Sequence, residues 1–570
     1  MNKYKEYSEK RKQEQIDDTL PEWYSTAGYQ MIREKKYIDE NETVKDRYNA
    51  IAETLSLHLP LEYQVQYKDK FFDLLWNGYL GAATPVYCNV GKPDKGLPIS
   101  CAGSMVADTV DSFYKTAHEI AMLSKNGFGT SAYLGDIRPR GSKISNGSKS
   151  DGVVPVLELI FNTTKHISQG STRRGSVACY LPISHLDFDE VIHWLENNSD
   201  GSNFGWCISD EDINKLNSNE PEMTRRYQEV MYLRMLGIGY LFFSDKVNRQ
   251  NPQIYKDNDL LVRHSNLCSE IQLVNDSTSY TFTCCLSSLN LMHWDRIKNI
   301  PDIIFDSIVF LDCVNSEFIK QSECIPGLEK ARNFAEWSRP IGLGVMGLSS
   351  YMQSKLIEFD ALEGHYLNSE IFKTIREEAD KANKWLAEIL GEPELMKGTG
   401  LRCSHLLAVA PTLSNAQISG GISNGIEPFF ANVYTQESAA GEMRRANPIL
   451  VELLKSKGKW KKDIIDSIAQ NSGSVQHLEF LSDKDKAVFK TAFEVDQMAI
   501  INMANARQLY IDQGQSINLF FSADAEEEYI SAVHQHAMLS ERIKSLYYVR
   551  SSAGVNARTS LSGGCTNCEG

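Results

Sequence analysis

Short β-like runs alternate with helical stretches along most of this 570-residue chain, and this alternation constrains the fold most. It begins near "ATPVYCNVG" (83–91) and is typical of a parallel sheet that helices cover or that closes on itself. A helix is expected over 111–127, with Asp111 as its N-cap and Gly127 as its C-terminal stop. The clearest expected strands are "SVACYLPI" (176–183), "IGYLFF" (238–243) and "HLLAVAP" (405–411). The sequence therefore predicts an α/β protein.

The two ends of the chain depart from this pattern. Apolar residues recur at three- and four-residue spacing over 44–59 and 62–78, which predicts an N-terminal helical region. Residues 551–570 are small, polar and glycine-rich, as is typical of a mobile tail. We therefore expect a helical domain over 1–97, an α/β catalytic domain over 98–548 and a flexible tail over 549–570.

Charge and cysteine content exclude several classes of protein. A net charge of −15 argues against sequence-independent binding of nucleic acid, which needs clustered Lys and Arg. The charged N-terminus lacks the apolar core of a signal peptide, and no apolar run approaches the ~18 residues that cross a bilayer. In such a chain the 12 cysteines should mostly be reduced thiols. We expect a soluble, cytoplasmic protein that binds neither nucleic acid nor membranes.

The segment "RHSNLCSE" (263–270) places an amide, a thiol and a carboxylate at every second position, as Asn266, Cys268 and Glu270. A half-buried edge strand would produce the same spacing. In an extended strand the outer two groups would lie about 13 Å apart, at ~3.3 Å per residue. The segment must therefore curl into a loop tip if the three groups act on one small molecule. Simple thiolate catalysis lacks support, because the orientation of the nearby His264 is not fixed by the sequence.

Two motifs favour structural interpretations. Gly342, Gly344 and Gly347 form a GxGxxG, but an Arg-Pro pair precedes it where a dinucleotide site has a hydrophobic strand. Close packing at a strand-to-helix turn is the better interpretation. Glu190 and His193 have the spacing of a di-iron carboxylate helix, but such sites need a second pair. A surface helix is favoured, and no metal site is expected.

Two further motifs favour chemistry. The tail pair Cys565 and Cys568 could be half of a zinc site, but the chain contains no second CxxC. Accessible, closely spaced thiols suit dithiol–disulfide exchange better. The segment "VAPTLSNAQIS" (409–419) runs from a strand into a Thr/Ser/Asn turn, whose N–H groups and hydroxyls could hold a phosphate or merely cap a helix.

Together, "NLCSE", "CCLSSLNL", "PTLSNAQ", "SLYYVR" and the terminal cysteine pair resemble the catalytic large subunit of class I ribonucleotide reductase. The motifs occur in the family order, and the resemblance covers the chain from about Leu20 to Gly570. It implies a ten-stranded α/β barrel that reduces ribonucleoside diphosphates by a radical route. It also implies a metal-containing small subunit that supplies the radical, a thioredoxin- or glutaredoxin-like reductant, and a homodimer that forms with nucleoside triphosphate effectors.

The resemblance assigns chemistry to individual residues. Cys268 matches the thiyl-radical cysteine that removes the 3′ hydrogen of the ribose, Glu270 the base for the 3′ hydroxyl, and Asn266 the amide that binds the sugar hydroxyls. Cys101 and Cys284 match the dithiol that supplies two electrons, although the adjacent Cys285 leaves the second partner open. The matches to the radical relay and to the pair that re-reduces the active site are Tyr547 with Tyr548, and Cys565 with Cys568.

Binding residues follow from the same resemblance. Those matching the substrate site are Thr84, Ser100, Gly129, Pro411, Thr412, Leu413, Ser414 and Asn415. Those matching the site for the specificity effector are Asp108, Thr109, Arg138, Ser145 and Arg173, with Arg174 in the same loop. Only about a hundred residues precede Cys101, so the N-terminal ATP-cone of many relatives is expected to be absent.

Three other functions were weighed. A class II reductase that uses adenosylcobalamin would need no tyrosine relay, so the Tyr547–Tyr548 pair argues against it. A non-catalytic nucleotide-binding regulatory protein would not retain five redox cysteines and the Asn/Glu pair. A simple thiol–disulfide oxidoreductase would need neither 570 residues nor the phosphate turn.

Overall fold

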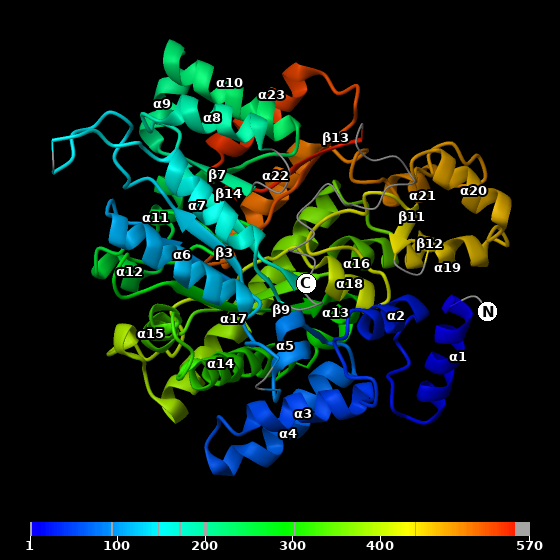
Figure 1. The fold of residues 1–570 in the computed structure, drawn as a ribbon. Coiled ribbons are helices and arrows are strands. Elements are labelled where there is room, and N and C mark those ends of the chain that lie inside the picture. The colour runs from blue at the N-terminus through cyan, green and yellow to red at the C-terminus, as the bar shows by residue number, and fades with distance from the viewer. Residues whose placement is uncertain are drawn as a thin grey trace.

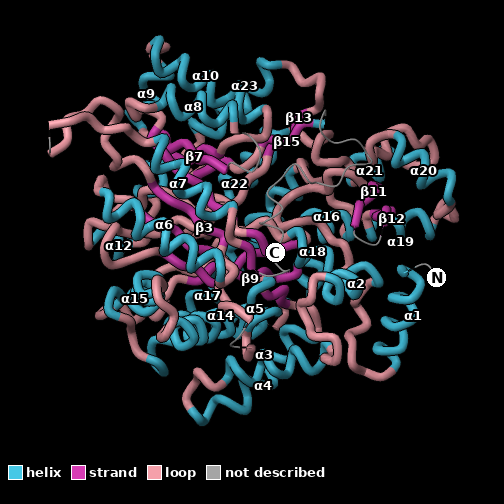
Figure 2. Tube along the Cα trace, in the orientation of Figure 1, coloured by secondary structure: helices cyan, strands magenta, loops and turns pink. Residues whose placement is uncertain are grey.

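Helices surround a strongly curled central sheet (Figures 1 and 2). The computed structural model describes residues 3–92, 95–145, 147–169, 173–198, 203–300, 302–438 and 441–552. Within these residues the sheet has the spatial order β1-β9-β2-β3-β6-β7-β8-β14, and β10 also pairs with β9. Its strands are β1 (Leu80–Ala82), β2 (Cys101–Met105), β3 (Gly129–Tyr133), β6 (Ser176–Pro182), β7 (Asn203–Ile208), β8 (Tyr240–Phe243), β9 (Phe282–Asn290), β10 (Ile341–Met346) and β14 (Ser545–Leu546).

The sheet closes into a barrel through two segments without a regular ladder. β2, β3, β6, β7 and β8 run parallel, while β9 and β14 pair antiparallel with β2 and β8 at the two seams. From β10 the ring continues through segments 405–409 and 513–517, because single bridges join Leu343 to Leu407 and Val409 to Gln515. The Tyr547 N–H then donates to the Ile517 carbonyl at 2.8 Å. The five parallel strands, β14, the two segments, β10 and β9 make up the expected ten-stranded barrel.

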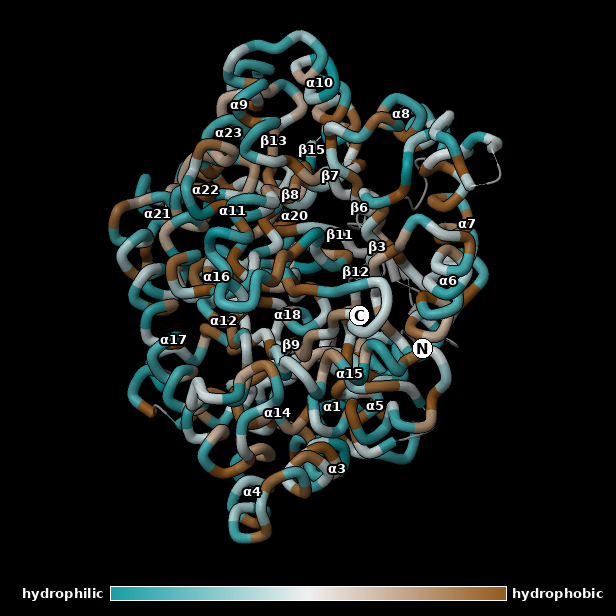
Figure 3. The backbone as a smooth tube through the Cα atoms, turned by 90° about the vertical axis from the view of Figure 1, so that its left-hand side faces the viewer, coloured by the Kyte–Doolittle hydropathy of each residue, from teal (hydrophilic) through white to brown (hydrophobic). Residues whose placement is uncertain are grey.

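The helices cover the outside of this barrel, and α14 packs against both β9 and β10. The helices between the strands are α5 (Thr84–Asn89), α6 (Val110–Lys125), α7 (Val154–Lys165), α8 (Phe188–Asn197), α9 (Asp210–Asn217), α10 (Pro221–Met235), α11 (Ser244–Arg249), α12 (Gln253–Asp257), α13 (Trp294–Ile297), α14 (Asp302–Ser322), α15 (Glu329–Ser338), α16 (Leu348–Ser354), α17 (Leu362–Leu390), α18 (Leu413–Ile418), α22 (Gln497–Arg507) and α23 (Glu527–Leu539). Apolar and hydrophilic stretches alternate along the outer helices, as expected where each buries one face (Figure 3).

The N-terminal region is helical, as predicted, and it is joined to the barrel. Its helices are α1 (Lys3–Ile16), α2 (Thr26–Glu34), α3 (Val44–Ser56) and α4 (Leu61–Trp76). Helices α3 and α4 pack against α14, and β1 adds to the sheet beside β9. One hydrophobic core therefore continues from this region into the barrel. A boundary at residue 97 stays a prediction.

Residues 433–489 form a lobe that the sequence did not lead us to expect (Figure 1). It contains the hairpin β11–β12 (Val433–Ser438 and Gly441–Ala446) and helices α19 (Pro448–Ser456), α20 (Lys462–Gln470) and α21 (Asp483–Val488). A separate cluster of buried apolar residues holds it together, including Leu450, Ile468 and Phe489. The remaining short strands are β4 (Ser168–Gln169), paired with β5 (Arg173–Arg174), and β13 (Leu519–Phe521), paired with β15 (Val549–Ser551).

The expected N-cap of α6 was wrong. Thr109 caps this helix, because its hydroxyl accepts the Ser112 N–H at 3.1 Å, whereas Asp111 is the second residue of the helix. Gly127 follows the helix with φ +99°, which suits its predicted role as a stop.

The glycines at the GxGxxG pack closely, as predicted. A Cβ added to Gly342 would lie 2.6 Å from Leu286 Cδ2, and one added to Gly344 would lie 2.5 Å from the Ala408 carbonyl oxygen. Gly347 leads from β10 into α16 with φ +82°. Side chains larger than hydrogen would therefore separate β10 from its neighbours.

The motif with Glu190 and His193 lies on α8 at the surface, where Glu190 accepts a hydrogen bond from Arg140. The His193 side chain is exposed. Across the described ranges, no group of three or more His, Cys, Asp or Glu residues is arranged to hold a metal ion. In the same part of the chain, every helix is too short or too polar to cross a membrane.

Candidate active site

Segment 266–271 forms a tight turn, as the convergence of its three functional groups requires. The Asn266 N–H donates to the Ile271 carbonyl at 3.2 Å, and the Ile271 N–H donates to Asn266 Oδ1 at 3.1 Å. Ser269 takes the left-handed conformation with φ +67° between these two residues. The turn replaces the extended strand that the spacing alone would favour, and it buries Asn266, Cys268 and Glu270.

Cys101 and Cys284 lie directly opposite each other on β2 and β9. Opposed residues of an antiparallel pair have Cα atoms about 4.5–5.5 Å apart, within the range of a disulfide. Asn266 Nδ2 donates to the Cys101 sulfur at 3.3 Å, and Gln513 Nε2 donates to the Cys284 sulfur at 3.4 Å. The turn and the two strands therefore bring three thiols to one end of the barrel.

Cys285 belongs to the other face of β9. Successive side chains of a strand point to opposite faces, and the Cys285 sulfur lies 3.8 Å from Asn315 Oδ1 of α14. It is part of the main hydrophobic core, whereas Cys284 shares a buried cluster with Cys101 and Cys268. Geometry thus favours Cys284 over Cys285 as the partner of Cys101.

A pocket, here called the thiol pocket, opens at this cluster. Cys101, Cys268 and Glu270 form part of its wall. Its other lining residues are Ala83, Thr84, Ser100, Gly129, Leu267, Leu286, Ser287, Ser288, Ala410, Pro411, Thr412, Ser414 and Asn415. Of the eight predicted substrate residues, all but Leu413 line this pocket. Leu413 lines a neighbouring cavity instead.

The carboxyl group of Glu270 can exchange a proton near neutral pH. Burial raises its pKa from 4.5 to about 7, against the opposing effect of hydrogen bonds from Asn266 and Ser516. A group with such a pKa can act efficiently as a general base at physiological pH. His264 cannot take this role, because burial lowers its pKa to about 3 and its ring lies between Tyr133 and Phe282.

Tyr547 and Tyr548 contact each other, with ring centroids 4.2 Å apart. Tyr547 belongs to the same buried cluster as Cys268. The Tyr548 hydroxyl donates to Asn203 Oδ1 at 2.8 Å and accepts from the Tyr240 hydroxyl at 2.9 Å. The pair therefore forms a continuous aromatic contact that begins in the cluster of thiols.

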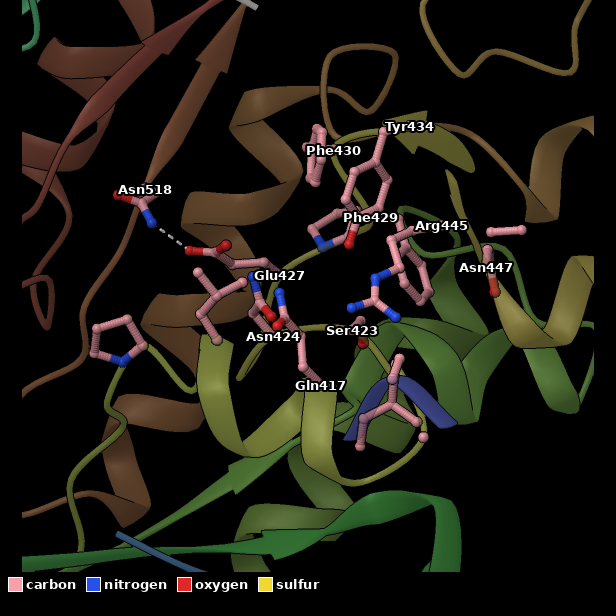
Figure 4. Close-up of a pocket in the computed structure, with 18 of the residues that line it drawn as sticks. Gln417, Ser423, Asn424, Glu427, Phe429, Phe430, Tyr434, Arg445, Asn447 and Asn518 are labelled. Carbon is pink, nitrogen blue, oxygen red and sulfur yellow. Dashed lines mark hydrogen bonds between the residues drawn. The ribbon is translucent and has the colours of Figure 1, made fainter. Parts of the chain in front are cut away.

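Both tyrosines also line a second cavity of about 280 Å³, here called the tyrosine cavity. Figure 4 shows Arg445 and Tyr434 of the 433–489 lobe facing Glu427 across it, with Asn518 hydrogen-bonded to Glu427. Arg550 also lines it and covers the Tyr548 ring, 4.6 Å from the centroid. Burial raises the pKa of Glu427 to about 7, a shift that the nearby Arg550 opposes.

The predicted effector residues are only partly brought together. Arg138 forms an ion pair with Asp108 and donates to the Lys143 carbonyl at 3.0 Å. Thr109 caps α6, and Ser145 is exposed in the loop that follows Arg138. Arg173 lies in β5, and its side chain is outside the described part of the structure, as are Cys565 and Cys568. The assignment of all these residues stays a prediction.

Several functional contacts were missed from the sequence: Gln513, Ser516, Tyr180, Tyr240 and Asn203. Ser516 Oγ lies 2.6 Å from the Cys268 carbonyl oxygen, and the Tyr180 hydroxyl donates to the Asn266 carbonyl at 2.7 Å. One signal was available for two of them. The run "DQGQS" (512–516) places polar residues immediately before the mostly apolar "INLFF". Polar residues in the loop next to a buried strand are often binding or catalytic residues.

Comparison with known proteins agrees with this geometry. The family model for the ribonucleotide reductase barrel domain matches residues 99–222, 227–399 and 392–549. The ribonucleoside-diphosphate reductase large subunit of Invertebrate iridescent virus 3 is 28% identical, over 97% of this chain and 100% of that protein. A putative large subunit from Frog virus 3 is 34% identical, over 89% of this chain and 91% of its own length.

A solved structure also matches the fold of this chain. The class Id ribonucleotide reductase alpha subunit of Actinobacillus ureae superimposes with a TM-score of 0.86 at 38% identity, covering 93% of this chain and 97% of that one. The fold is thus that of relatives that share most of the length of this chain. The chain belongs to the ribonucleotide reductase family, as a class I large subunit with ribonucleoside-diphosphate reductase activity.

Proposed function

We propose that the thiol pocket is where the ribose is reduced, with Cys268 as the radical-bearing residue. The observation that carries this proposal is the convergence of Cys268, Glu270 and Cys101 in the wall of one pocket, with Cys284 directly opposite Cys101 on the neighbouring strand. A hydrogen-abstracting sulfur, a base and two reducing thiols are the groups that removal of a ribose hydroxyl requires.

The reaction balances with these groups. A Cys268 thiyl radical takes the 3′ hydrogen atom, and Glu270 takes the proton of the 3′ hydroxyl. The 2′ hydroxyl leaves as water, with a proton from the Cys101–Cys284 dithiol. The dithiol gives up two electrons and two protons in total and becomes a disulfide. Glu270 returns its proton to the 3′ oxygen, and Cys268 returns the hydrogen atom to C3′. The sum is one ribonucleotide and two thiols converted to one deoxyribonucleotide, one disulfide and one water.

The substrate is held by the rest of the pocket. We assign Asn266 to the sugar hydroxyls, because its amide donates to the sulfur of Cys101, which lies in the pocket wall. We assign the diphosphate to the turn over 411–415, with Thr84, Ser100 and Gly129 completing the wall. Thr412 stabilises this turn, since its hydroxyl accepts the Gly425 N–H at 2.8 Å.

The radical comes from a separate small subunit that contains a metal, and passes through Tyr548 and then Tyr547. Support comes from the ring contact between the two and from their position between the thiol cluster and the tyrosine cavity. A phenol ordinarily has a pKa near 10, so its oxidation at neutral pH must release a proton. This relay distinguishes the proposal from a class II reductase, which makes its radical beside the substrate.

The remaining partners follow the family pattern. Cys565 and Cys568 would reduce the Cys101–Cys284 disulfide and then be reduced by a thioredoxin- or glutaredoxin-like protein. A nucleoside triphosphate near Asp108, Thr109, Arg138, Ser145 and Arg173 would select the substrate in a homodimer. None of the ten described cysteines forms a disulfide, which suits a reducing compartment such as the cytoplasm.

The test is deoxynucleotide formation from a ribonucleoside diphosphate with dithiothreitol. The full chain would be assayed with the metal-loaded small subunit from the same source and, separately, with adenosylcobalamin alone. We expect product only with the small subunit. Product with adenosylcobalamin alone would contradict the relay but retain the role of Cys268.

A further inference from the structure

Ser516 touches two acceptors of the catalytic turn at once. Its Oγ lies 2.6 Å from the carbonyl oxygen of Cys268 and 3.1 Å from Glu270 Oε2. Both contacts are fully buried, so water does not compete for them. Ser516 belongs to the segment that closes the barrel, and its own N–H donates to the Val409 carbonyl at 2.9 Å. This contact holds the backbone of Ser516 in place.

A serine hydroxyl has one proton, and this limits what it can donate. When Glu270 is ionised, both neighbours of Ser516 are acceptors, and the hydroxyl can satisfy only one of them. A charge-assisted hydrogen bond is roughly twice as strong as a neutral one. The Ser516 hydroxyl therefore donates to the Glu270 carboxylate, and the Cys268 carbonyl loses its hydrogen bond.

When Glu270 is neutral, the same three groups form a chain. The carboxyl O–H donates to Ser516 Oγ, and the Ser516 hydroxyl donates to the Cys268 carbonyl. All three groups are then satisfied, and the short 2.6 Å contact is the bond expected for this state.

We propose that Ser516 is a positioning residue that couples the protonation state of Glu270 to the hydrogen bond on the backbone carbonyl of Cys268. The importance of this coupling rests on the proposed roles of Cys268 and Glu270. When Glu270 takes the proton of the substrate, the Ser516 hydroxyl turns to the Cys268 carbonyl and holds the turn while the sulfur has the hydrogen atom. When Glu270 returns the proton, the carbonyl is released.

The groups that face Glu270 include the Tyr180 hydroxyl, the Cys284 and Cys268 thiols, and the Asn266 amide. Burial holds the pKa values of Tyr180 and Cys284 well above their ordinary values. Lys544 donates to the Gln513 carbonyl at 2.9 Å, in the same segment as Ser516, and burial lowers its pKa to about 7. Loss of the pH-dependent change in Glu270→Gln therefore assigns that change to Glu270.

The test is isotope-edited infrared spectroscopy of the full chain with ¹³C at the carbonyl carbon of cysteine. Subtracting the spectrum of Cys268→Ser isolates the Cys268 carbonyl from the other labelled cysteines. We expect its band to move to higher frequency from about pH 5.5 to about pH 8.5, with a midpoint near the pKa of Glu270, as the hydrogen bond is lost.

Four variants decide the outcome. Ser516→Ala and Glu270→Gln should abolish the pH-dependent shift, whereas Ser516→Thr should retain it. Ser545→Ala is the matched control, because Ser545 donates to the neighbouring Ser269 carbonyl at 3.0 Å, and it should also retain the shift.

A band that does not move in the unmodified protein would overturn the coupling, and so would the same shift in Ser516→Ala. If Ser516→Ala does not fold, persistence of the shift in Glu270→Gln contradicts the proposal equally well. The spectra need no substrate, partner or turnover, so their failure is distinct from failure of the proposed function.

Discussion

The thiol pocket and the tyrosine cavity share Pro411 in their walls but differ in chemistry. Apart from Glu270, the thiol pocket is lined by neutral residues, and its reactive turn is held by buried hydrogen bonds. The tyrosine cavity is lined by Arg444, Arg445 and Arg550 together with several aromatic rings. A hydrogen-atom transfer moves no net charge and so suits a pocket of mostly neutral residues. Arg and aromatic residues, in contrast, are enriched at interfaces between protein chains. Under the proposed function, the two regions divide bond-breaking from radical delivery.

The largest loss of turnover is expected for a substitution of Cys268 in the thiol pocket. Cys268→Ser should lower turnover by roughly 10⁴-fold or more, because a hydroxyl cannot replace the thiyl radical. Nucleotide affinity, measured by calorimetry, should change by less than about threefold. Cys207→Ser is the control, since that thiol is also buried but lies outside the catalytic turn and hydrogen-bonds to the Arg263 carbonyl. Retained multiple turnover in Cys268→Ser would remove the radical assignment.

Two adjacent thiols on β9 should behave differently. Cys284→Ser should reduce multiple turnover by about 10³-fold or more, because the dithiol can no longer form a disulfide. Cys285→Ser should keep most of the activity and lose about 1–3 kcal/mol of stability, since it buries a hydroxyl in the apolar core. Steady-state assays and chemical denaturation separate the two effects. The opposite pattern would make Cys285 the partner of Cys101.

In the second region, the relay should depend on Tyr548 more than on Tyr240. Tyr548→Phe should lower the rate with the small subunit by about 10³-fold, or about 4 kcal/mol, because it removes the oxidisable O–H. Tyr240→Phe removes the hydrogen bonds of the Tyr240 hydroxyl to Tyr548 and Asn203 and should cost about tenfold. Both should bind substrate normally. Equal rates in Tyr548→Phe and the unmodified enzyme would exclude the relay.

Each region contains one carboxyl with a pKa of about 7, Glu270 in the thiol pocket and Glu427 in the tyrosine cavity. The folded state keeps each proton up to about pH 7, whereas the unfolded state loses it near the ordinary value of 4.5. Stability from these groups is therefore full at low pH and is lost as pH rises from 4.5 toward 7. At pH above 7, Glu270→Gln and Glu427→Gln should each raise stability by up to about 3 kcal/mol.

Activity should separate these two carboxyls where stability does not. The kcat/KM of the unmodified enzyme should rise with pH through about 7, as Glu270 becomes the ionised base. Glu270→Gln should remove both the activity and this rise of kcat/KM with pH. Glu427→Gln should leave the rise in place. A rise that shifts in Glu427→Gln would instead assign it to Glu427.

The sequence predicted the thiol pocket well and the tyrosine cavity poorly, for physical reasons. Asn266, Cys268 and Glu270 lie within five positions of one another, so their action on one small molecule required the turn that Ser269 makes. Ser516 and Tyr240 act across contacts that only the closed barrel creates, and the sequence does not encode such contacts locally. The 433–489 lobe was missed because its helices lack a distinctive motif. Segment 405–409 lies within the strand predicted over 405–411, but in the structure it and segment 513–517 pair through single bridges and form no regular strand.

The central claim is that Cys101 and Cys284 are oxidised to each other when the ribose is reduced. We would incubate the prereduced double variant Cys565→Ser/Cys568→Ser with the small subunit and a ribonucleoside diphosphate, without reductant. Disulfides would then be mapped by mass spectrometry and compared with the deoxynucleotide formed. The account predicts one Cys101–Cys284 disulfide per deoxynucleotide, and none without substrate. Deoxynucleotide formed without this disulfide, or with Cys285 in place of Cys284, would contradict it.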